Sequence, residues 1–124
     1  MRKIMCAAVS VMALGCLGQA PANASGTADD GPVGIGVIGE GLRVREVRAT
    51  LDGWEAGARA RVSLWKGGSY VRMVRAWKYT SSKEARGYRH EYAAWKINQN
   101  FPHRSQLCVE FRGHDRRPCV TIKR

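Results

Sequence analysis

Apolar and polar residues alternate through much of the chain after residue 24, and this period of two predicts β-strands. The clearest example is Ala58–Lys66, in which Ala58, Ala60, Val62 and Leu64 point one way and Arg59, Arg61, Ser63 and Trp65 the other. The same pattern predicts strands over 42–52, 70–79, 107–112 and 119–123. We also predict a strand over Tyr88–Ile97, because it is short and aromatic, although two alanines within 91–96 leave a helix as the alternative.

Turn residues separate these segments at short intervals. Asp52-Gly53, Lys66–Ser69 and Asn98–Pro102 are turn signals, and Thr80–Gly87 reads as a polar loop. About six or seven short strands with such turns favour an all-β fold, a small antiparallel β-sandwich of two sheets with an immunoglobulin-like build. Within it we assign Phe101 and Trp77 to the core and Trp65 to the surface.

The C-terminal residues 107–124 predict a hairpin closed by a disulfide. Folding the segment about Gly113-His114 places Glu110 opposite Arg117 and Cys108 opposite Cys119, with the cysteines on the outer side of the hairpin. Directly opposed strand positions have Cβ atoms about 4.5–5.5 Å apart, which is close to what a disulfide needs. Two unpaired thiols are the alternative.

Residues 1–24 read as a signal peptide. Arg2 and Lys3 precede an apolar stretch too short to span a bilayer, and Ala22-Asn23-Ala24 fits the small-residue pattern of a cleavage site before Ser25. We therefore expect secretion, and an oxidising environment in which cysteines can pair. The alternative is lipidation at Cys16, which follows an imperfect lipobox.

Residues 25–41 read as a flexible, glycine-rich leader and arm, and residues 42–124 as the β-sandwich domain. Glycine alternates with apolar residues in the arm, and such a segment suits insertion into another protein's sheet or groove. The arm residues expected to bind a partner are Val33, Ile35, Val37 and Ile38. An ordinary edge strand of the protein's own domain is the alternative.

The chain is strongly basic, with 21 Lys and Arg against 10 Asp and Glu and a formal net charge of +11. This charge predicts attraction to an anionic surface or an acidic protein. A genomic bias toward arginine is the plainer explanation.

Aromatic and basic residues are interleaved through the middle strands. Arginine, tryptophan and tyrosine dominate the energetics of protein interfaces, and stacking on single-stranded nucleic acid uses the same chemistry. The residues expected to form a partner-binding surface are Trp65, Arg59, Arg61, Arg72 and Arg75. The alternative is that most of the aromatic rings cap the ends of the sandwich core.

Catalytic and cofactor signatures are weak. The histidines lack metal-ligand spacing, no GxSxG elbow is present, and the acids are few and scattered, so we expect no enzyme activity, metal, cofactor, small-molecule substrate or specific nucleic acid. A small secreted nuclease or hydrolase using His90 or His103 is the weaker alternative.

The closing residues 95–124, with the asparagine-phenylalanine turn and paired cysteines, and the opening 39–47 resemble small secreted β-sandwich proteins of streptomycetes. Some of these are similar to adaptor subunits of antibacterial umbrella toxin particles. The resemblance implies a non-enzymatic adaptor that links a lectin-like subunit to the stalk of a large toxin. It brings no catalytic residue and does not explain the positive charge.

We therefore expect a secreted protein-binding module, as an adaptor in a toxin complex. The main alternative is a stand-alone cationic protein that binds an anionic cell envelope, as an antimicrobial or wall-binding protein.

Overall fold

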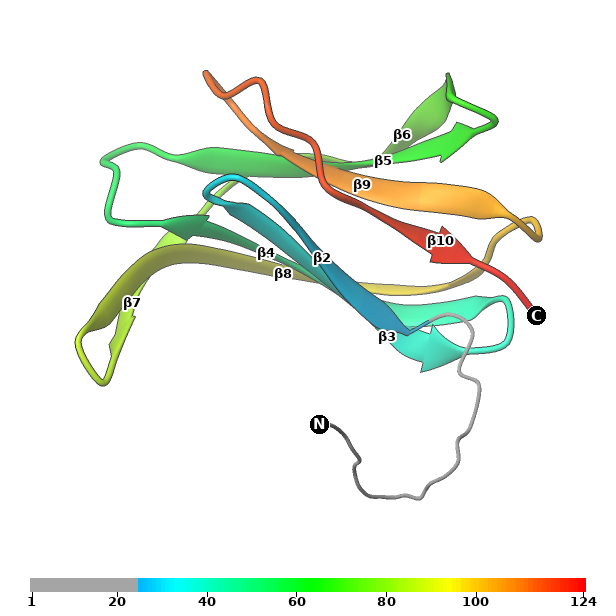
Figure 1. Ribbon diagram of the computed structural model, residues 1–124, viewed down its shortest axis with the longest axis horizontal. Helices are drawn as coiled ribbons and strands as arrows, with labels where there is room; N and C mark the ends of the chain where they lie inside the picture. The colour runs from blue at the N-terminus through cyan, green and yellow to red at the C-terminus, as the bar shows by residue number, and fades with distance from the viewer. Residues whose placement is uncertain (1–24) are drawn as a thin grey trace.

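The computed structural model describes residues 25–124, and the expected signal peptide and Cys16 lie outside this range. The described chain forms nine strands (Figure 1). They are β2 (Gly26–Asp30), β3 (Val33–Glu40), β4 (Arg43–Asp52), β5 (Arg59–Lys66), β6 (Ser69–Tyr79), β7 (Ser81–Ala85), β8 (Tyr88–Asn100), β9 (Ser105–Phe111) and β10 (Cys119–Ile122). The predicted all-β class is confirmed, and the strand assignment for Tyr88–Ile97 is confirmed over the helical alternative.

The strands form two antiparallel sheets that pack face to face. One has four strands in the order β10-β9-β5-β6, and the other has five in the order β2-β3-β4-β8-β7. Figure 1 shows β10 and β9 lying over β2 and β3, with the β8–β7 hairpin extending away from the four-stranded sheet. The fold is therefore the predicted two-sheet sandwich, with β2 and β7 as strands that the sequence pattern did not indicate.

The core lies between the sheets and follows the alternation of the sequence. Strand β5 buries Ala60, Val62 and Leu64, as predicted, and Phe101 fills one end of the core at 2 % exposure. In β4 the register against β8 shifts between Val44 and Glu46. This bulge turns apolar residues on both sides of it into the same core, because an extra residue reverses the alternation.

The arm interpretation of Val33–Glu40 is wrong. This segment is strand β3, hydrogen-bonded to β2 on one side and β4 on the other. Val33, Ile35 and Val37 are 0 %, 4 % and 3 % exposed, and Ile38 is half-buried. The expected leader supplies the outer strand β2, turning back at Gly31, whose φ of 63° favours glycine. The sandwich therefore begins at β2, and the apolar residues expected to insert into a partner belong to this protein's own core.

The polar segment 80–87 is also more ordered than predicted. Ser81–Ala85 forms the short strand β7, which pairs with β8 from Ser81↔Tyr92 to Ala85↔Tyr88. All five β7 residues are exposed, so no apolar alternation marks the strand in the sequence. Backbone pairing around the turn at Arg86-Gly87 defines it instead.

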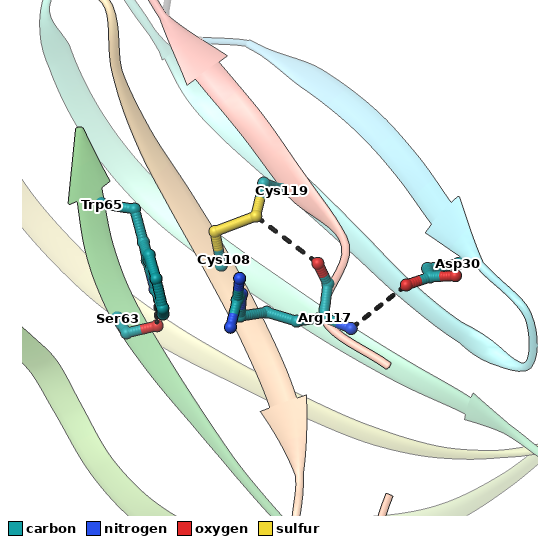
Figure 2. Close-up of a disulfide and its surroundings, with 6 residues drawn as sticks. All are labelled: Asp30, Ser63, Trp65, Cys108, Arg117 and Cys119. Atoms are coloured by element: carbon teal, nitrogen blue, oxygen red, sulfur yellow. Dashed lines mark hydrogen bonds between the residues drawn. A yellow bond between two sulfur atoms is a disulfide. The ribbon is translucent and has the colours of Figure 1, made fainter. Parts of the chain in front are cut away.

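The C-terminal disulfide is confirmed. Cys119 lies opposite Cys108 in the β10–β9 register, and their sulfur atoms are bonded. The cysteines lie on the predicted outer side of the hairpin, where Cys108 pairs with Ser63 of β5 and is fully buried. Figure 2 shows the Arg117 side chain passing beside the disulfide toward Trp65.

Candidate functional site

The outer face of the four-stranded sheet gathers arginine and aromatic side chains. Residues that point away from the core on β5 lie opposite aromatic residues on β6, with Arg59 paired to Tyr79 and Trp65 to Tyr70. We call the group the Arg–aromatic face. It comprises Arg59, Arg61, Trp65, Tyr70, Trp77, Tyr79 and Arg117.

Three aromatic rings on this face are each in contact with an arginine guanidinium. The guanidinium carbon of Arg59 lies 5.2 Å from the ring centroid of Tyr79. That of Arg61 lies 4.5 Å from the centroid of Trp77. A cation within about 6 Å of a ring centroid is attracted by the ring's quadrupole, so these contacts hold the arginines in place on an otherwise open sheet.

The closest of these pairs joins Arg117 to Trp65, with the guanidinium carbon 3.6 Å from the ring centroid. Trp65 is held from its other sides as well. Its indole N–H donates to the buried Ser63 hydroxyl at 2.9 Å (Figure 2). The Tyr70 ring packs edge-on against the indole, with the two ring centroids 5.6 Å apart. The half-buried ring is thus fixed on the outer face of the sheet, pointing away from the core as the alternation of β5 predicts.

Charge is divided unequally between the sheets. Seven of the ten acidic residues lie on strands of the five-stranded sheet: Asp29, Asp30, Glu40, Glu46, Asp52, Glu84 and Glu91. Strands of the four-stranded sheet carry six cations, Arg59, Arg61, Lys66, Arg72, Arg75 and Lys78, against the single acid Glu110. Glu110 is engaged by Arg61 at 2.8 Å. Strands of the five-stranded sheet also carry six cations, Arg43, Arg45, Arg48, Lys83, Arg89 and Lys96. The sheets therefore differ in their acids, and the net positive charge of the strands lies on the four-stranded sheet.

Two predicted members of the surface, Arg72 and Arg75, do not join the Arg–aromatic face. Arg75 donates to the carbonyl of Lys96 at 3.0 Å, and the guanidinium of Arg72 lies 5.8 Å from the ring centroid of Phe101. Lys78 similarly donates to the carbonyl of Ala94. These side chains bridge β6 to β8 at the open side of the sandwich, because bulges in the β5–β6 ladder change the direction of successive β6 residues.

Trp77 and Arg117 were misassigned from the sequence. Trp77 is 36 % exposed on the Arg–aromatic face instead of lying in the core. Arg117 was expected to lie opposite Glu110 in the hairpin, but Glu110 pairs with Arg61 and residues 112–118 form a loop. One signal could have found Arg117. It lies two residues before Cys119, and residues two apart in an extended chain point the same way.

The histidines, of which His90 and His103 were the weaker catalytic candidates, do not come together. His114 contacts Glu55, and His103 accepts a hydrogen bond from the backbone N–H of Arg124. Partial desolvation and the surrounding cations lower the pKa of His103, which favours the neutral, accepting form. Within residues 25–124 no three His, Cys, Asp or Glu side chains come together as metal ligands would.

Glu91 is a buried carboxylate at 2 % exposure, but its oxygens are already occupied. They accept hydrogen bonds from the hydroxyls of Thr80 and Ser82, both at 2.7 Å, and from the N–H of Glu55 at 3.0 Å. Burial raises the pKa of Glu91, and these hydrogen bonds outweigh it, so the pKa lies below the ordinary value. Glu91 therefore has a structural role, because it attaches both the 53–57 loop and β7 to strand β8.

Comparisons of the chain with protein-family models, with curated protein sequences and with solved structures found no match. Residues 25–124 contain no helical segment with the length and hydrophobicity required to cross a lipid bilayer.

Proposed function

We propose that the protein is a non-enzymatic, secreted binding module that docks an acidic protein partner on its Arg–aromatic face. The observation that carries the proposal is the set of three arginine–aromatic stacks, Arg59–Tyr79, Arg61–Trp77 and Arg117–Trp65, on one exposed sheet. Arginine, tryptophan and tyrosine are the residues that contribute most to binding energy at protein interfaces.

The preorganisation of these side chains supports the proposal. Trp65 is held by Ser63, Tyr70 and Arg117, so binding does not have to order it. Immobilising a flexible side chain at an interface costs about 0.5–1.5 kcal/mol, and a face already held in place avoids part of that cost.

The partner is expected to be acidic, because the strands of this sheet carry a single acid, Glu110, that Arg61 already engages. Complementary charge would speed the encounter and fix the orientation of the complex. The resemblance to umbrella-particle adaptors gives this proposal its more specific form, a link between subunits of a secreted antibacterial toxin complex. An adaptor needs two partners, and the buried strand β3 does not supply the second surface.

Site-specific photo-crosslinking tests the proposal. A photoreactive phenylalanine analogue replaces Tyr79, which is 68 % exposed on the Arg–aromatic face. The matched control carries the same analogue at Tyr88, which is 48 % exposed on the other sheet. Each protein is incubated in the culture medium of the producing organism, irradiated and analysed by mass spectrometry.

The expected result is a defined adduct with one acidic secreted protein from position 79 and none from position 88. Equal adducts from both positions, or none from position 79, would overturn the proposal. Binding of the unirradiated protein to polyanions alone, lost in high salt, would instead assign the protein to the cationic envelope-binding class.

A further inference from the structure

A groove of about 380 Å³ crosses the outer face of the five-stranded sheet, away from the Arg–aromatic face. Its floor is strand β3, where Gly34 and Gly36 lie at successive outward positions. The neighbouring strands β2 and β4 carry side chains at the paired positions. The backbones of β2 and β4 are two strand spacings apart, about 10 Å, and their side chains lean over β3 between them.

The cross-strand register places the residues that line the groove in two rows, each running across the strands. Asp29 on β2 and Thr50 on β4 both pair with Gly34. Thr27 and Arg48 pair with Gly36 in the same way. Tyr92 on β8 continues the first row beyond Thr50, and His90 lies beside it.

Folding does not require glycine at position 36. Its φ is not in the positive region, and a Cβ built there would meet a single neighbour, the Cβ of Arg48, at 4.0 Å. Glycine inside a strand nevertheless costs stability and often marks the close approach of a ligand. The missing side chain has one structural effect here, which is to keep the groove open.

Gly34 has a different role. A Cβ at this position would lie 2.7 Å from the Thr50 hydroxyl oxygen and 2.8 Å from one carboxylate oxygen of Asp29. Two polar oxygens from different strands therefore converge over Gly34, which is buried beneath them. Both remain able to accept hydrogen bonds from a ligand lying beside them over Gly36.

The remaining lining suits a ligand rich in hydroxyl groups. Thr27, Thr50 and Tyr92 each offer a hydroxyl that can donate or accept, Asp29 accepts and Arg48 donates. His90 Nδ1 is a buried polar atom without a partner among the described residues, and a rotation of the ring toward the groove would give it one.

Two charged side chains line the groove, Asp29 and Arg48. Arg48 is bonded to Glu46 at 2.6 Å, so with Glu46 included the local charge is one negative unit. The groove therefore lacks the net positive charge of the other sheet, which disfavours an anionic ligand. The mixture of donors and acceptors fits a neutral ligand.

We infer that this groove binds a neutral oligosaccharide, with a sugar ring lying over Gly36 and its hydroxyls bonded to Asp29, Thr50 and Arg48. The site is independent of the proposed docking function, because it occupies the opposite sheet. A protein with both surfaces joins a secreted partner to a glycan.

The test titrates the ¹⁵N-labelled protein with chitotetraose, cellotetraose, maltotetraose and mannotetraose and follows amide chemical shifts. Gly36→Val fills the groove with a residue that favours strands, so the variant should keep its fold. Ala76→Val, on the exposed part of β6, is the matched control for a small-to-valine change. Thermal unfolding of both variants checks that each remains folded.

At least one of the four sugars should give saturable shifts at Asp29, Gly34, Thr50 and Tyr92, with Kd of about 1 mM or below. Gly36→Val should weaken that binding at least about tenfold, and Ala76→Val should leave it unchanged. Absence of saturable shifts with all four sugars at about ten times that concentration would overturn the inference, as would shifts that survive in folded Gly36→Val.

Discussion

The guanidinium carbon of Arg117 lies 3.6 Å from the ring centroid of Trp65, and this contact joins the C-terminal loop to β5. The backbone N–H of Arg117 also donates to Asp30 of β2, and two residues later Cys119 is bonded to Cys108 of β9 (Figure 2). A residue in a loop is therefore held by both sheets, which explains how it contributes to a fixed surface.

Replacing Arg117 by alanine should change the environment of Trp65 without unfolding the protein. The stack is worth about 0.5–2 kcal/mol, which is a small share of a domain's stability. The measurement is the Trp65 indole N–H resonance, which should shift in Arg117→Ala. Arg112→Ala, an exposed arginine in the same loop, should leave that resonance in place. An unshifted indole signal in Arg117→Ala would mean that the stack does not form in solution.

Removing the disulfide should cost stability and loosen the docking surface together. The bond closes a loop with a sequence separation of 11, and loops of this size contribute about 2–3 kcal/mol in the chain-entropy account. Urea denaturation of the Cys108→Ala/Cys119→Ala protein should show that loss. The same protein should show the Trp65 indole shift of Arg117→Ala, because Arg117 lies two residues from Cys119. A stable variant with an unshifted indole would show that the disulfide does not position Arg117.

Glu91→Ala should lower the free energy of unfolding by about 3 kcal/mol, because it removes a buried charged acceptor and the three part-buried hydrogen bonds that it makes. Glu84→Ala removes an exposed carboxylate of neighbouring β7 and should cost less than about 1 kcal/mol. Chemical denaturation at neutral pH compares the two variants. Equal losses would contradict the anchoring role of Glu91.

The effect of Glu91 should also depend on pH. Its folded-state pKa lies below the ordinary value of 4.5, so the unfolded state takes up a proton first as the pH falls. The stability that Glu91 contributes is therefore complete above that ordinary value and is lost as the pH falls through the folded-state pKa. The difference between wild type and Glu91→Ala should shrink across that acidic window, and a constant difference would contradict the assignment.

Tyr88 should ionise later than an ordinary tyrosine. Its hydroxyl donates to the carboxylate of Asp52, which with partial burial raises the pKa of Tyr88 from 10.0 to about 12. The stability from this hydrogen bond is present below the ordinary value and is lost as the pH rises through about 12. An ultraviolet pH titration should show one late tyrosine that Asp52→Asn returns to the ordinary range. Asp115→Asn, at an exposed loop residue, is the control.

Deleting residues 25–40 should unfold the protein, because Val33, Ile35 and Val37 are part of the core and β3 pairs with β4 along its length. An inserting arm would have left the remaining sandwich folded. Circular dichroism and thermal unfolding of the truncated protein distinguish the two. Deleting only residues 25–30 removes the outer strand β2 and should leave a less stable protein with a cooperative transition.

The period-two pattern was sufficient to predict the fold class, the β5 faces and the Cys108–Cys119 pairing. It failed where pairing or bulges, rather than alternation, decide the structure. Strand β7 is entirely exposed and so carries no apolar signal. The bulged β5–β6 ladder put Trp77 on the surface and turned Arg75 toward β8.

The candidate sites could likewise be predicted where local alternation decides the structure and not where strand pairing does. Arg59, Arg61 and Trp65 could be placed on one face because they lie an even number of residues apart on strand β5. The groove could not be predicted, because it depends on which residues of β2 and β4 lie opposite Gly34 and Gly36. Register across strands that are distant in sequence is set by the folded core rather than by local pattern.

The central claim is that the Arg–aromatic face binds an acidic protein. The most direct measurement uses the purified partner identified by crosslinking and determines its Kd for two double variants of this protein. Each variant replaces two arginines by glutamates, so both change the net charge equally. Arg59→Glu/Arg117→Glu alters the face, whereas Arg43→Glu/Arg45→Glu alters exposed positions of β4 on the other sheet.

We predict that the first double variant binds at least about tenfold more weakly than wild type, since it reverses charges at the contact. The second should bind within about threefold of wild type, because rim or distant charges act mainly through the encounter rate. Equal weakening by both variants, or none by the first, would contradict the assignment of the docking surface to this face.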